Sequence, residues 1–345
     1  MARKDILRFA LPSKGEMESP TLLFLETAGL RVQRPNARQY AAEIPALPGT
    51  TVLFQRAADI AGKVEEGSVD LGITGFDTVA EHQHEGSDLI VVEQSLGFSG
   101  CELVVAVPDS WVDISSIADV AELSAEFRDK GRDFRVATKY PRLTRQFFYE
   151  KGINHFSLVE SKGALEAAPL MGYADLITDL TSSGTTLREN RLKMIAGGSI
   201  VRSQACLIGN RRSLRHDPAK LELTHQILEA FEARQRADRY YSLTANIRGA
   251  SAEAVAQLIL TQPDYAGMQG PTVARVYSKA EDGGCWWAVT IVIERRHLNG
   301  AREHLRRCGA SSVTVYPARY VFANVSATYQ RLLRTLGVEE PVAVD

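Results

Sequence analysis

The first hundred residues alternate apolar runs of strand length with segments of helical spacing. Ser19 and Pro20 resemble the start of a helix, and Gly29 ends that helix. Residues 59–66 form a second helical segment, which Gly67 ends. The apolar runs predict buried strands at residues 7–11, 52–54, 69–73 and 103–107. Strands alternating with helices predict a mostly parallel sheet with helices on its faces.

The same alternation restarts after Pro108. Strands are expected at residues 134–138, 156–159 and 174–179, and helices at 144–152 and 164–171. The segment at 67–73 resembles the one at 172–178, since each has a glycine after a helical segment and then a strand that ends near a carboxylate. We therefore predict two α/β lobes of similar plan, resembling a bilobal periplasmic-binding-protein-like fold, with a ligand cleft between them. Lobe I is assigned residues 1–107 and 203–237, and lobe II residues 108–202.

The last hundred residues follow a different order. A strand at 204–208 and a long helix that begins at Asp217 and Pro218 lead to a charged boundary near residue 238. Strands are then expected at 241–247, 272–277, 286–293 and 312–316, with helices at 251–260 and 299–308. This βαββαβ order predicts a ferredoxin-like (ACT-like) domain over residues 238–345. The pattern alone also suits a dimerisation module or an RNA-binding domain, although the central strands lack stacking aromatic residues for RNA.

Composition narrows the functional class. The 345-residue chain carries a net charge of −2, which argues against a dedicated nucleic-acid binder. Its four cysteines are far apart and form no C-x-x-C pair, so a structural zinc site is not expected. No apolar stretch reaches the length of a membrane span, and residues 1–5 do not resemble the start of a signal segment. We expect a cytoplasmic protein with no membrane and no nucleic-acid partner.

The most informative segment runs from Asp179 to Leu187. A strand ends near a carboxylate, and small hydroxyl residues with one glycine lead into a helical segment. Glycine lets the backbone approach an anion, and hydroxyl groups donate hydrogen bonds to phosphate oxygens. Asp179 is placed to accept hydrogen bonds from ribose hydroxyls. The segment thus suits a 5-phosphoribosyl group, while an ordinary Ser/Thr-rich turn is the alternative.

This loop resembles the phosphoribosyl pyrophosphate (PRPP) loop of the ATP phosphoribosyltransferase family. The similarity extends over nearly the whole chain, through blocks in the family's order at residues 11–15, 54–56, 71–77, 136–141, 164–169, 270–272 and 309–313. The C-terminal module resembles the regulatory domain of the family's long form.

The resemblance implies a reaction and a site. The family joins N1 of the ATP adenine to C1 of PRPP with loss of pyrophosphate, as the first step of histidine biosynthesis, and uses Mg²⁺. The implied catalytic residues are Lys14, Arg56 and Asp179, with Lys139 as a further cation in a family block. The implied PRPP site is Asp179, Thr181, Ser182, Ser183, Gly184, Thr185 and Thr186. The implied ATP site is Leu11, Ser13, Lys14, Gly15, Arg56, Asp77 and Glu166.

Magnesium is expected to bind mostly to substrate phosphates, with Asp179 as the candidate protein ligand. For Lys139 a surface role, and for Glu166 an ordinary helical role, remain open. One residue departs from the family pattern, which commonly has arginine where this chain has Glu16. An anion near phosphates would weaken binding unless Glu16 points away or another cation, such as Arg8, substitutes.

The resemblance also implies regulation. The C-terminal domain of the family binds L-histidine, and the matching positions here are Met268, Thr272, Ala310, Ser311 and Ser312. We expect histidine to bind between modules of neighbouring subunits and to inhibit the enzyme, in a homo-oligomer that assembles from dimers to a hexamer. A module used only for assembly is the alternative. For the whole protein, the alternatives are a catalytically silent nucleotide or amino-acid sensor and a two-lobed solute-binding protein.

Overall fold

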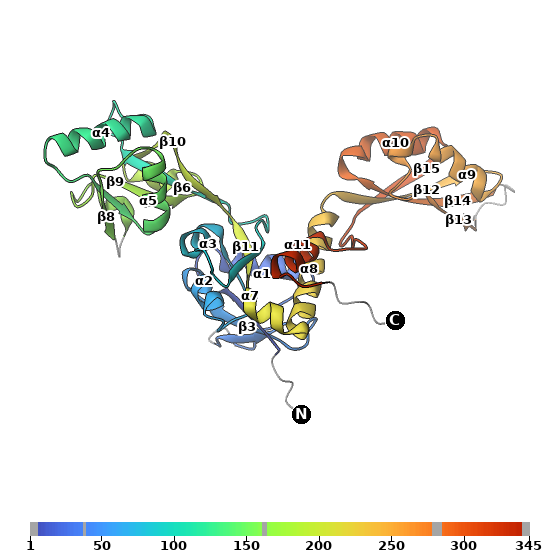
Figure 1. The fold of residues 1–345 in the computed structure, drawn as a ribbon. Helices are drawn as coiled ribbons and strands as arrows, with labels where there is room; N and C mark the ends of the chain where they lie inside the picture. The colour runs from blue at the N-terminus through green and yellow to red at the C-terminus, as the bar shows by residue number, and fades with distance from the viewer. Residues whose placement is uncertain (1–5, 37–38, 161–163, 278–284, 340–345) are drawn as a thin grey trace. The chain divides into compact units, whose positions relative to one another are not determined.

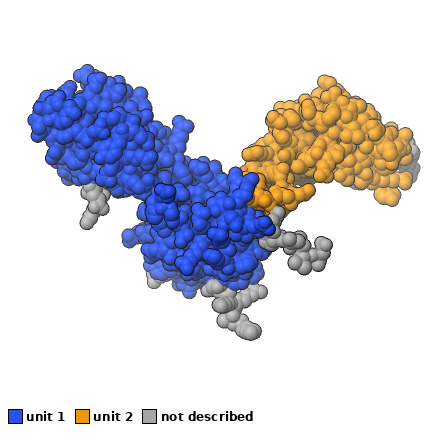
Figure 2. Space-filling view, in the orientation of Figure 1, with its two compact units in different colours: residues 1–26, 31–224, 331–345 blue, residues 27–30, 225–330 orange. Residues whose placement is uncertain are grey.

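A computed structural model describes residues 6–36, 39–160, 164–277 and 285–339 (Figure 1). Residues 1–5, on which the expectation about a signal segment rests, lie outside these ranges. The chain divides into two compact units (Figure 2). One comprises Met1–Glu26, Arg31–Thr224 and Arg331–Asp345, and the other comprises Thr27–Leu30 and His225–Gln330.

The first unit contains two sheets, which correspond to two α/β lobes. The sheet of lobe I has the order β2 (Ala41–Glu43), β3 (Thr50–Gln55), β1 (Leu7–Pro12), β4 (Leu71–Gly75), β11 (Ala205–Asn210) and β5 (Leu89–Glu93). Strand β1 pairs in parallel with β3 and β4, whereas β11 runs antiparallel to β4 and β5. The helices of this lobe are α1 (Glu18–Thr27), α2 (Ala57–Glu65) and α3 (Phe76–His82).

Helix α2 packs closely on this sheet. Ile60 and Val64 of α2 belong to a buried cluster with Ala10 and Ile208 of the strands. A Cβ atom on Gly72 would lie 2.4 Å from Cγ2 of Ile60, so the glycine in β4 is what allows this approach. Because β1, β3 and β4 are parallel neighbours, their carboxyl ends lie at one edge of the sheet.

The sheet of lobe II has the order β10 (Leu192–Ser203), β6 (Cys101–Pro108), β9 (Leu176–Thr181), β7 (Arg135–Thr138) and β8 (Ser157–Glu160). Strands β9, β7 and β8 are parallel, and β6 is antiparallel to both of its neighbours. Its core is rich in aromatic residues, including Phe127, Phe134 and Phe148. The helices are α4 (Ile117–Asp129), α5 (Pro141–Glu150), α6 (Thr185–Glu189) and the 3₁₀ turn η1 (Leu165–Ala167).

Two details differ from the sequence-based expectations for the first unit. Strand β6 belongs to the second sheet, so the boundary between the lobes lies before residue 101 and not after residue 107. The helix expected at 164–171 is only the turn η1, because Pro169 has no N–H to continue a helix.

The second unit has the expected βαββαβ order. Its elements are β12 (Tyr240–Arg248), α9 (Ala252–Leu260), η2 (Pro263–Tyr265), β13 (Thr272–Val276), β14 (Trp286–Glu294), η3 (Arg295–His297), α10 (Leu298–Arg307) and β15 (Ala310–Pro317). The sheet order is β13-β14-β12-β15 with every pair antiparallel, and α9 and α10 lie on one face of it (Figure 1). Leu243, Ile247, Val255, Ile259 and Leu305 lie in the core between them. The ferredoxin-like fold is confirmed.

The domain ends differ from the expected ones. After α7 (Arg211–His216), helix α8 (Pro218–Ala237) passes from the first unit into the second at residue 225, so the division falls inside the helix. Helix α11 (Ala327–Leu336) carries the chain back, and residues 331–345 group with the first unit. The compact unit therefore begins before the expected start at residue 238, inside α8, and ends before residue 345.

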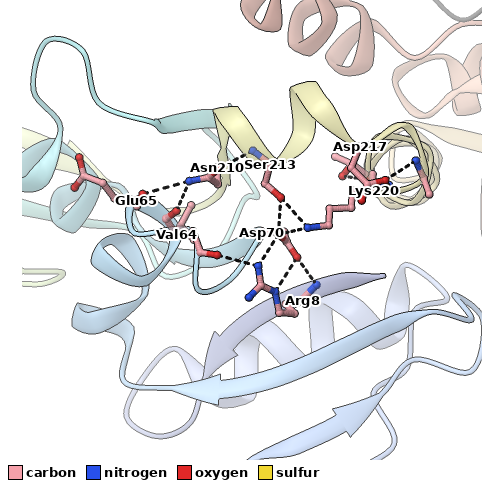
Figure 3. Close-up of polar contacts among 11 residues, drawn as sticks. Arg8, Val64, Glu65, Asp70, Asn210, Ser213, Asp217 and Lys220 are labelled. Carbon is pink, nitrogen blue, oxygen red and sulfur yellow. Dashed lines mark hydrogen bonds and ion pairs between the residues drawn. The ribbon is translucent and has the colours of Figure 1, made fainter. Parts of the chain in front are cut away.

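An arginine–aspartate pair clamps each lobe at the start of its strands. In lobe I, Arg8 donates to Asp70 from its backbone N, Nε and Nη2, and Nη2 also donates to the carbonyl of Gly67. In Figure 3, Ser213 and Lys220 point at the same carboxylate. In lobe II, Arg135 makes the equivalent bonds to Asp175 and to the carbonyl of Gly172.

The clamp settles one question raised by the sequence. Arg8 lies at the start of β1 and its guanidinium is paired with Asp70, whereas Glu16 follows the other end of that strand. The suggestion that Arg8 supplies a substitute cation beside Glu16 is therefore wrong.

Candidate functional site

A cavity of about 690 Å³ opens in the first unit where strands of both sheets end. Its lobe I wall comes from segments that follow β1, β3 and β4: Glu16, Met17, Pro20, Ala57, Ala58, Asp77 and Thr78, with Gly75 at the end of β4. Its lobe II wall follows β7 and β9: Tyr140, Ser182, Ser183, Thr185, Thr186 and Leu187, with Leu180 and Thr181 at the end of β9 and Glu166 from η1. Carboxyl ends of parallel strands commonly form ligand sites in α/β proteins.

The hydroxyl-rich loop between β9 and α6 is built around Gly184. This residue has φ +71°, a conformation that favours glycine, and a Cβ there would lie 3.1 Å from Nη1 of Arg188. Its N–H donates to Oγ1 of Thr181, at 2.8 Å. The side chains of Ser182, Ser183, Thr185 and Thr186 are exposed and line the cavity. The loop therefore presents four hydroxyl groups to a ligand.

Arg188 is a loop contact that the sequence analysis did not single out. Its guanidinium donates to the carbonyl of Ser183 and to Oγ1 of Thr185, each at 3.2 Å. Its place one turn into the helical segment after the loop was the available signal. It fixes the loop and puts a cation beside the hydroxyls of the loop.

Asp179 lies behind the loop in β9, and it does not line the cavity wall. Burial raises the pKa of its carboxyl above the ordinary value, while the N–H of Leu180, donating to Oδ1 at 2.9 Å, and the charge of Lys139 pull the pKa down. The charge of Glu166 raises this pKa further. The charges of Lys139 and Glu166 thus act on Asp179 at the ends of β7 and β9. The three residues lie in separate segments of the sequence, so the sequence did not show that they interact.

The residues assigned to ATP are only partly gathered at the cavity. Asp77 and Glu166 line it, but Leu11 is fully buried in the core, so its side chain offers no ligand contact. The exposed side chains of Lys14 and Arg56 and the neighbouring Ser13 and Gly15 lie outside the lining. They follow β1 and β3 directly beside residues that do line it, and the N–H of Ser13 donates to the carbonyl of Gln55, joining the two segments. Glu16 itself faces the cavity.

Asp77 is held by the protein on both carboxylate oxygens. It is 4% exposed. Oδ1 accepts from Oγ of Ser203 at 2.5 Å, and Oδ2 accepts from the hydroxyl of Tyr140 at 2.6 Å. The sequence analysis assigned no role to Tyr140 or Ser203, although Tyr140 lies in one of the family blocks.

A second cavity of about 540 Å³ shares residues of the loop with the first. Thr181, Ser182 and Ser183 border both, and Gly184, Met194, Arg202 and Gln204 line only the second. Ser99, with φ +53°, lines the first cavity, and its neighbour Gly100 borders both. The loop therefore has open space on two sides.

Candidate metal ligands are sparse. Within the described ranges, no group of three or more His, Cys, Asp or Glu residues is arranged to hold a metal ion. Likewise, no helix in the described part of the chain has both the length and the apolarity to cross a membrane.

The residues assigned to histidine lie at two edges of the second unit's sheet. Thr272 begins edge strand β13, with Met268 four residues before it, and Ala310, Ser311 and Ser312 lie at the start of edge strand β15. Strands β14 and β12 separate the two groups. At about 4.8 Å per strand the edges are roughly 14 Å apart, so one chain does not bring them together.

Comparison with known proteins gives consistent matches along the chain. The family model for ATP phosphoribosyltransferase (HisG) matches residues 56–233, and the model for the HisG C-terminal domain matches residues 237–320. ATP phosphoribosyltransferase 1, chloroplastic, from Arabidopsis thaliana is 40% identical over 343 residues, which are 98% of this chain and 83% of that protein. ATP phosphoribosyltransferase from Brucella melitensis is 48% identical over 207 residues, 59% of this chain and 90% of that protein.

Among solved structures, the ATP phosphoribosyl transferase (HisG:HisZ) complex from Thermotoga maritima matches with a TM-score of 0.50 and 24% identity. The match covers 66% of this chain and 96% of that one, and at this identity it supports the fold alone.

Proposed function

The chain belongs to the ATP phosphoribosyltransferase family, and from this premise we propose how its cavity serves the reaction. The enzyme joins N1 of the ATP adenine to C1 of PRPP and releases pyrophosphate, the first step of histidine biosynthesis. The C-terminal match marks the long form. The observation that carries the proposal is the hydroxyl-rich loop 181–186, which faces segments of lobe I across one cavity.

The loop is assigned the 5-phosphate of PRPP. The hydroxyls of Ser182, Thr185 and Thr186 can donate to phosphate oxygens, while that of Ser183 donates to Oγ1 of Thr185, and Gly184 keeps the backbone accessible to the anion. Asp179, one strand position behind Leu180, is assigned the ribose hydroxyls. Burial raises the pKa of Asp179 because it removes water from the ionised carboxylate. Hydrogen bonds donated by ribose hydroxyls would stabilise this ionised form.

Lobe I is assigned ATP. Lys14 and Arg56 are proposed to hold its phosphates, together with the backbone at Ser13 and Gly15, because both side chains are exposed beside the lobe I wall. Glu166 is proposed to contact the adenine or its ribose from lobe II. The reaction centre becomes more positive while pyrophosphate leaves as an anion, so positioning and charge stabilisation are the main tasks of these residues.

The site fits a magnesium ion held mainly by substrate phosphates. The described residues offer no cage of three ligands, and Asp179 is the carboxylate behind the loop. Bound Mg²⁺ would neutralise phosphate charge. The positive charge of bound Mg²⁺ would also offset the negative charge of Glu16 in the lobe I wall.

Pyrophosphate release from the purified protein given ATP, PRPP and Mg²⁺ tests the function. Release that requires PRPP supports the assignment. Folded protein that binds ATP without turnover would favour the catalytically silent sensor, and Glu16→Gln would then show whether the extra anion is the cause.

The charges around Asp179 give a pH test of the site. If ionised Asp179 binds PRPP, kcat/KM for PRPP should fall on the acid side. Lys139→Met removes an influence that lowers the Asp179 pKa, so the acid limb should move to higher pH. Glu166→Gln removes an influence that raises it, so the limb should move to lower pH. Shifts in the same direction, or a limb that persists in Asp179→Asn, would contradict the assignment.

We also propose that L-histidine inhibits the enzyme and binds between C-terminal domains of two subunits. The separation of Thr272 from Ser311 and Ser312 on opposite edge strands supports a shared site, because a head-to-tail arrangement of two copies would place the β13 edge of one beside the β15 edge of the other. Histidine affinity should then rise with protein concentration through the range in which sedimentation shows assembly, whereas an affinity independent of assembly would contradict the shared site. A homo-oligomer, from dimer to hexamer, and a cytoplasmic location belong to the same proposal, and sedimentation and cell fractionation test them.

A further inference from the structure

Helix α3 of lobe I presents two carboxylates to the first turn of α5 in lobe II. Asp77 and Glu81 are four residues apart and so lie on one face of α3. Asp77 accepts from the Tyr140 hydroxyl at 2.6 Å. Glu81 accepts from the backbone N–H groups of Arg142, at 2.7 Å, and Leu143, at 2.9 Å.

These contacts supply a helix cap from the other lobe. Tyr140 occupies the N-cap position of α5 and its side chain caps no backbone N–H. The first N–H groups of a helix have no partner within it, and a carboxylate there is favoured. Glu81 fills this role, and Nε of Arg142 donates back to the carbonyl of Glu81 at 2.8 Å. The two lobes are therefore bonded at the start of α5.

The start of α5 is in turn bonded to the strand that carries the loop. The N–H of Tyr140 donates to Oγ1 of Thr138, at 2.9 Å. Buried hydroxyls of Thr138, Thr144 and Thr178 hydrogen-bond one another at 2.6 to 3.1 Å. Thr178 directly precedes Asp179 in β9, so α3 is connected to the PRPP loop through a continuous set of short contacts.

Gly75 leaves room for this arrangement. A Cβ at Gly75 would lie 2.3 Å from Oδ1 of Asp77. Oδ1 of Asp77 accepts from Ser203, and Oδ2 accepts from Tyr140 and from Thr78, at 3.3 Å, so both carboxylate oxygens are hydrogen-bonded within the protein.

We propose that Glu81 and Asp77 are positioning residues that set the PRPP loop at its working distance from the ATP-binding lobe. This inference rests on the proposed function, and it replaces a direct ATP contact by the Asp77 carboxylate. Glu81 lines neither of the two cavities at the loop, so its effect on turnover must pass through α5.

The test compares Glu81→Ala with a cap that does not cross between lobes. Asp119→Ala is the matched control, because Asp119 caps α4 through Ser115 and Ser116 within lobe II. Glu81→Ala should lower kcat about tenfold to 100-fold at temperatures where the protein stays folded, since small misplacements of reacting groups cost that much. Asp119→Ala should lower the melting temperature and leave kcat within about twofold. Glu81→Gln keeps one acceptor and should restore part of the rate.

Two further readouts separate positioning from a general structural role. In Glu81→Ala with Tyr140→Phe, the losses in kcat should not multiply, because both variants release the same helix start. Amide exchange at Arg142 and Leu143 should speed up in Glu81→Ala and not in Asp119→Ala.

An unchanged kcat in Glu81→Ala, losses that multiply, or equal amide exchange in the wild type and Glu81→Ala would each overturn the inference. A wild-type protein without PRPP-dependent turnover would count against the proposed function, and the amide exchange would still decide whether the contact between the lobes exists.

Discussion

The two lobes contain the same clamp, but only one of them uses it to hold a returning chain. In both, an arginine in a strand binds an aspartate just before the neighbouring parallel strand, and its guanidinium also binds a glycine carbonyl three residues before that aspartate. Asp175 of lobe II is 11% exposed in its side chain, and in the described part of the chain Arg135 is the cation paired with it.

Asp70 of lobe I is fully buried and serves more partners. Lys220 donates to its Oδ1 at 2.8 Å, and Ser213 donates to the same oxygen. Both come from the segment that follows β11, after the chain has left lobe I, built lobe II and returned. The same local motif therefore also serves as a long-range anchor in lobe I, where it holds the segment that follows β11.

The largest difference is expected when each aspartate loses its charge. Asp70→Asn leaves two cations without a counter-ion, Lys220 and Arg8, whose side chains are 18% and 39% exposed, and should cost about 3 kcal/mol of unfolding free energy. Asp175→Asn leaves a half-buried arginine that water can reach and should cost about 1 kcal/mol. Urea denaturation of the two variants checks this, and equal losses would contradict the comparison.

The pH dependence of the unfolding free energy should reflect the ion pairs of Asp70 with Arg8 and Lys220. Burial alone would raise the pKa of Asp70, but hydrogen bonds from Arg8, Lys220 and Ser213 outweigh it and hold the pKa below the ordinary 3.8. The stabilisation is therefore complete above pH 3.8 and is lost as the pH falls through the lower folded-state pKa. The stability gap between the wild type and Asp70→Asn should shrink in that acid range. A gap that closes already near neutral pH would show that another group is responsible.

Removing the second cation should make the clamp of lobe I resemble that of lobe II. Lys220→Met leaves Asp70 paired with Arg8 and should cost about 1.5–3 kcal/mol, the usual contribution of a hydrogen bond to a charged group. Lys130→Met, which removes an exposed pair with Glu126 four residues away, is the control and should cost about 0.5 kcal/mol. Thermal unfolding measures both, and a Lys220→Met loss as small as the control would rule out an anchoring role.

The smallest effect is expected from the neutral partner. Ser213→Ala removes one hydroxyl from Asp70 and should cost about 1 kcal/mol. Ser68→Ala, which removes an exposed hydroxyl bonded to the carbonyl of Lys63, should stay within about 0.5 kcal/mol in the same urea titration. A Ser213→Ala loss larger than that of Lys220→Met would reverse the assigned order.

Much of the fold was predictable from short-range patterns. The strands at 7–12, 135–138 and 240–248 and the βαββαβ order follow from apolar runs and helix punctuation. The strand at 101–108 was recognised, but its sheet was not, because an apolar run fits any sheet that buries both faces. Strand β10 and helix α4 were missed, since β10 mixes glycines and charges and half of its residues are not apolar.

The candidate site was predictable where it is local. Residues 181–186 form the expected loop, and all of them except Gly184 line the first cavity, because glycine and hydroxyl chemistry acts over a few residues. The partners of Asp77 were not predictable, since Tyr140 and Ser203 are 63 and 126 positions away in the sequence. Lys14 and Arg56 were assigned to the ATP site, but they lie beside the residues that line the cavity. The sequence does not fix where a long exposed side chain points, because its direction depends on the groups around it in the folded protein.

Residue types at short, fixed spacings are enough to identify the family, most of the element types and the hydroxyl-rich loop. Which sheet takes β6, the anchoring of the returning chain by Asp70, and the cap that Glu81 gives to a helix of the other lobe follow only from the folded chain. Such choices depend on contacts between distant segments, whose free energy appears only when both segments are folded and water is excluded between them.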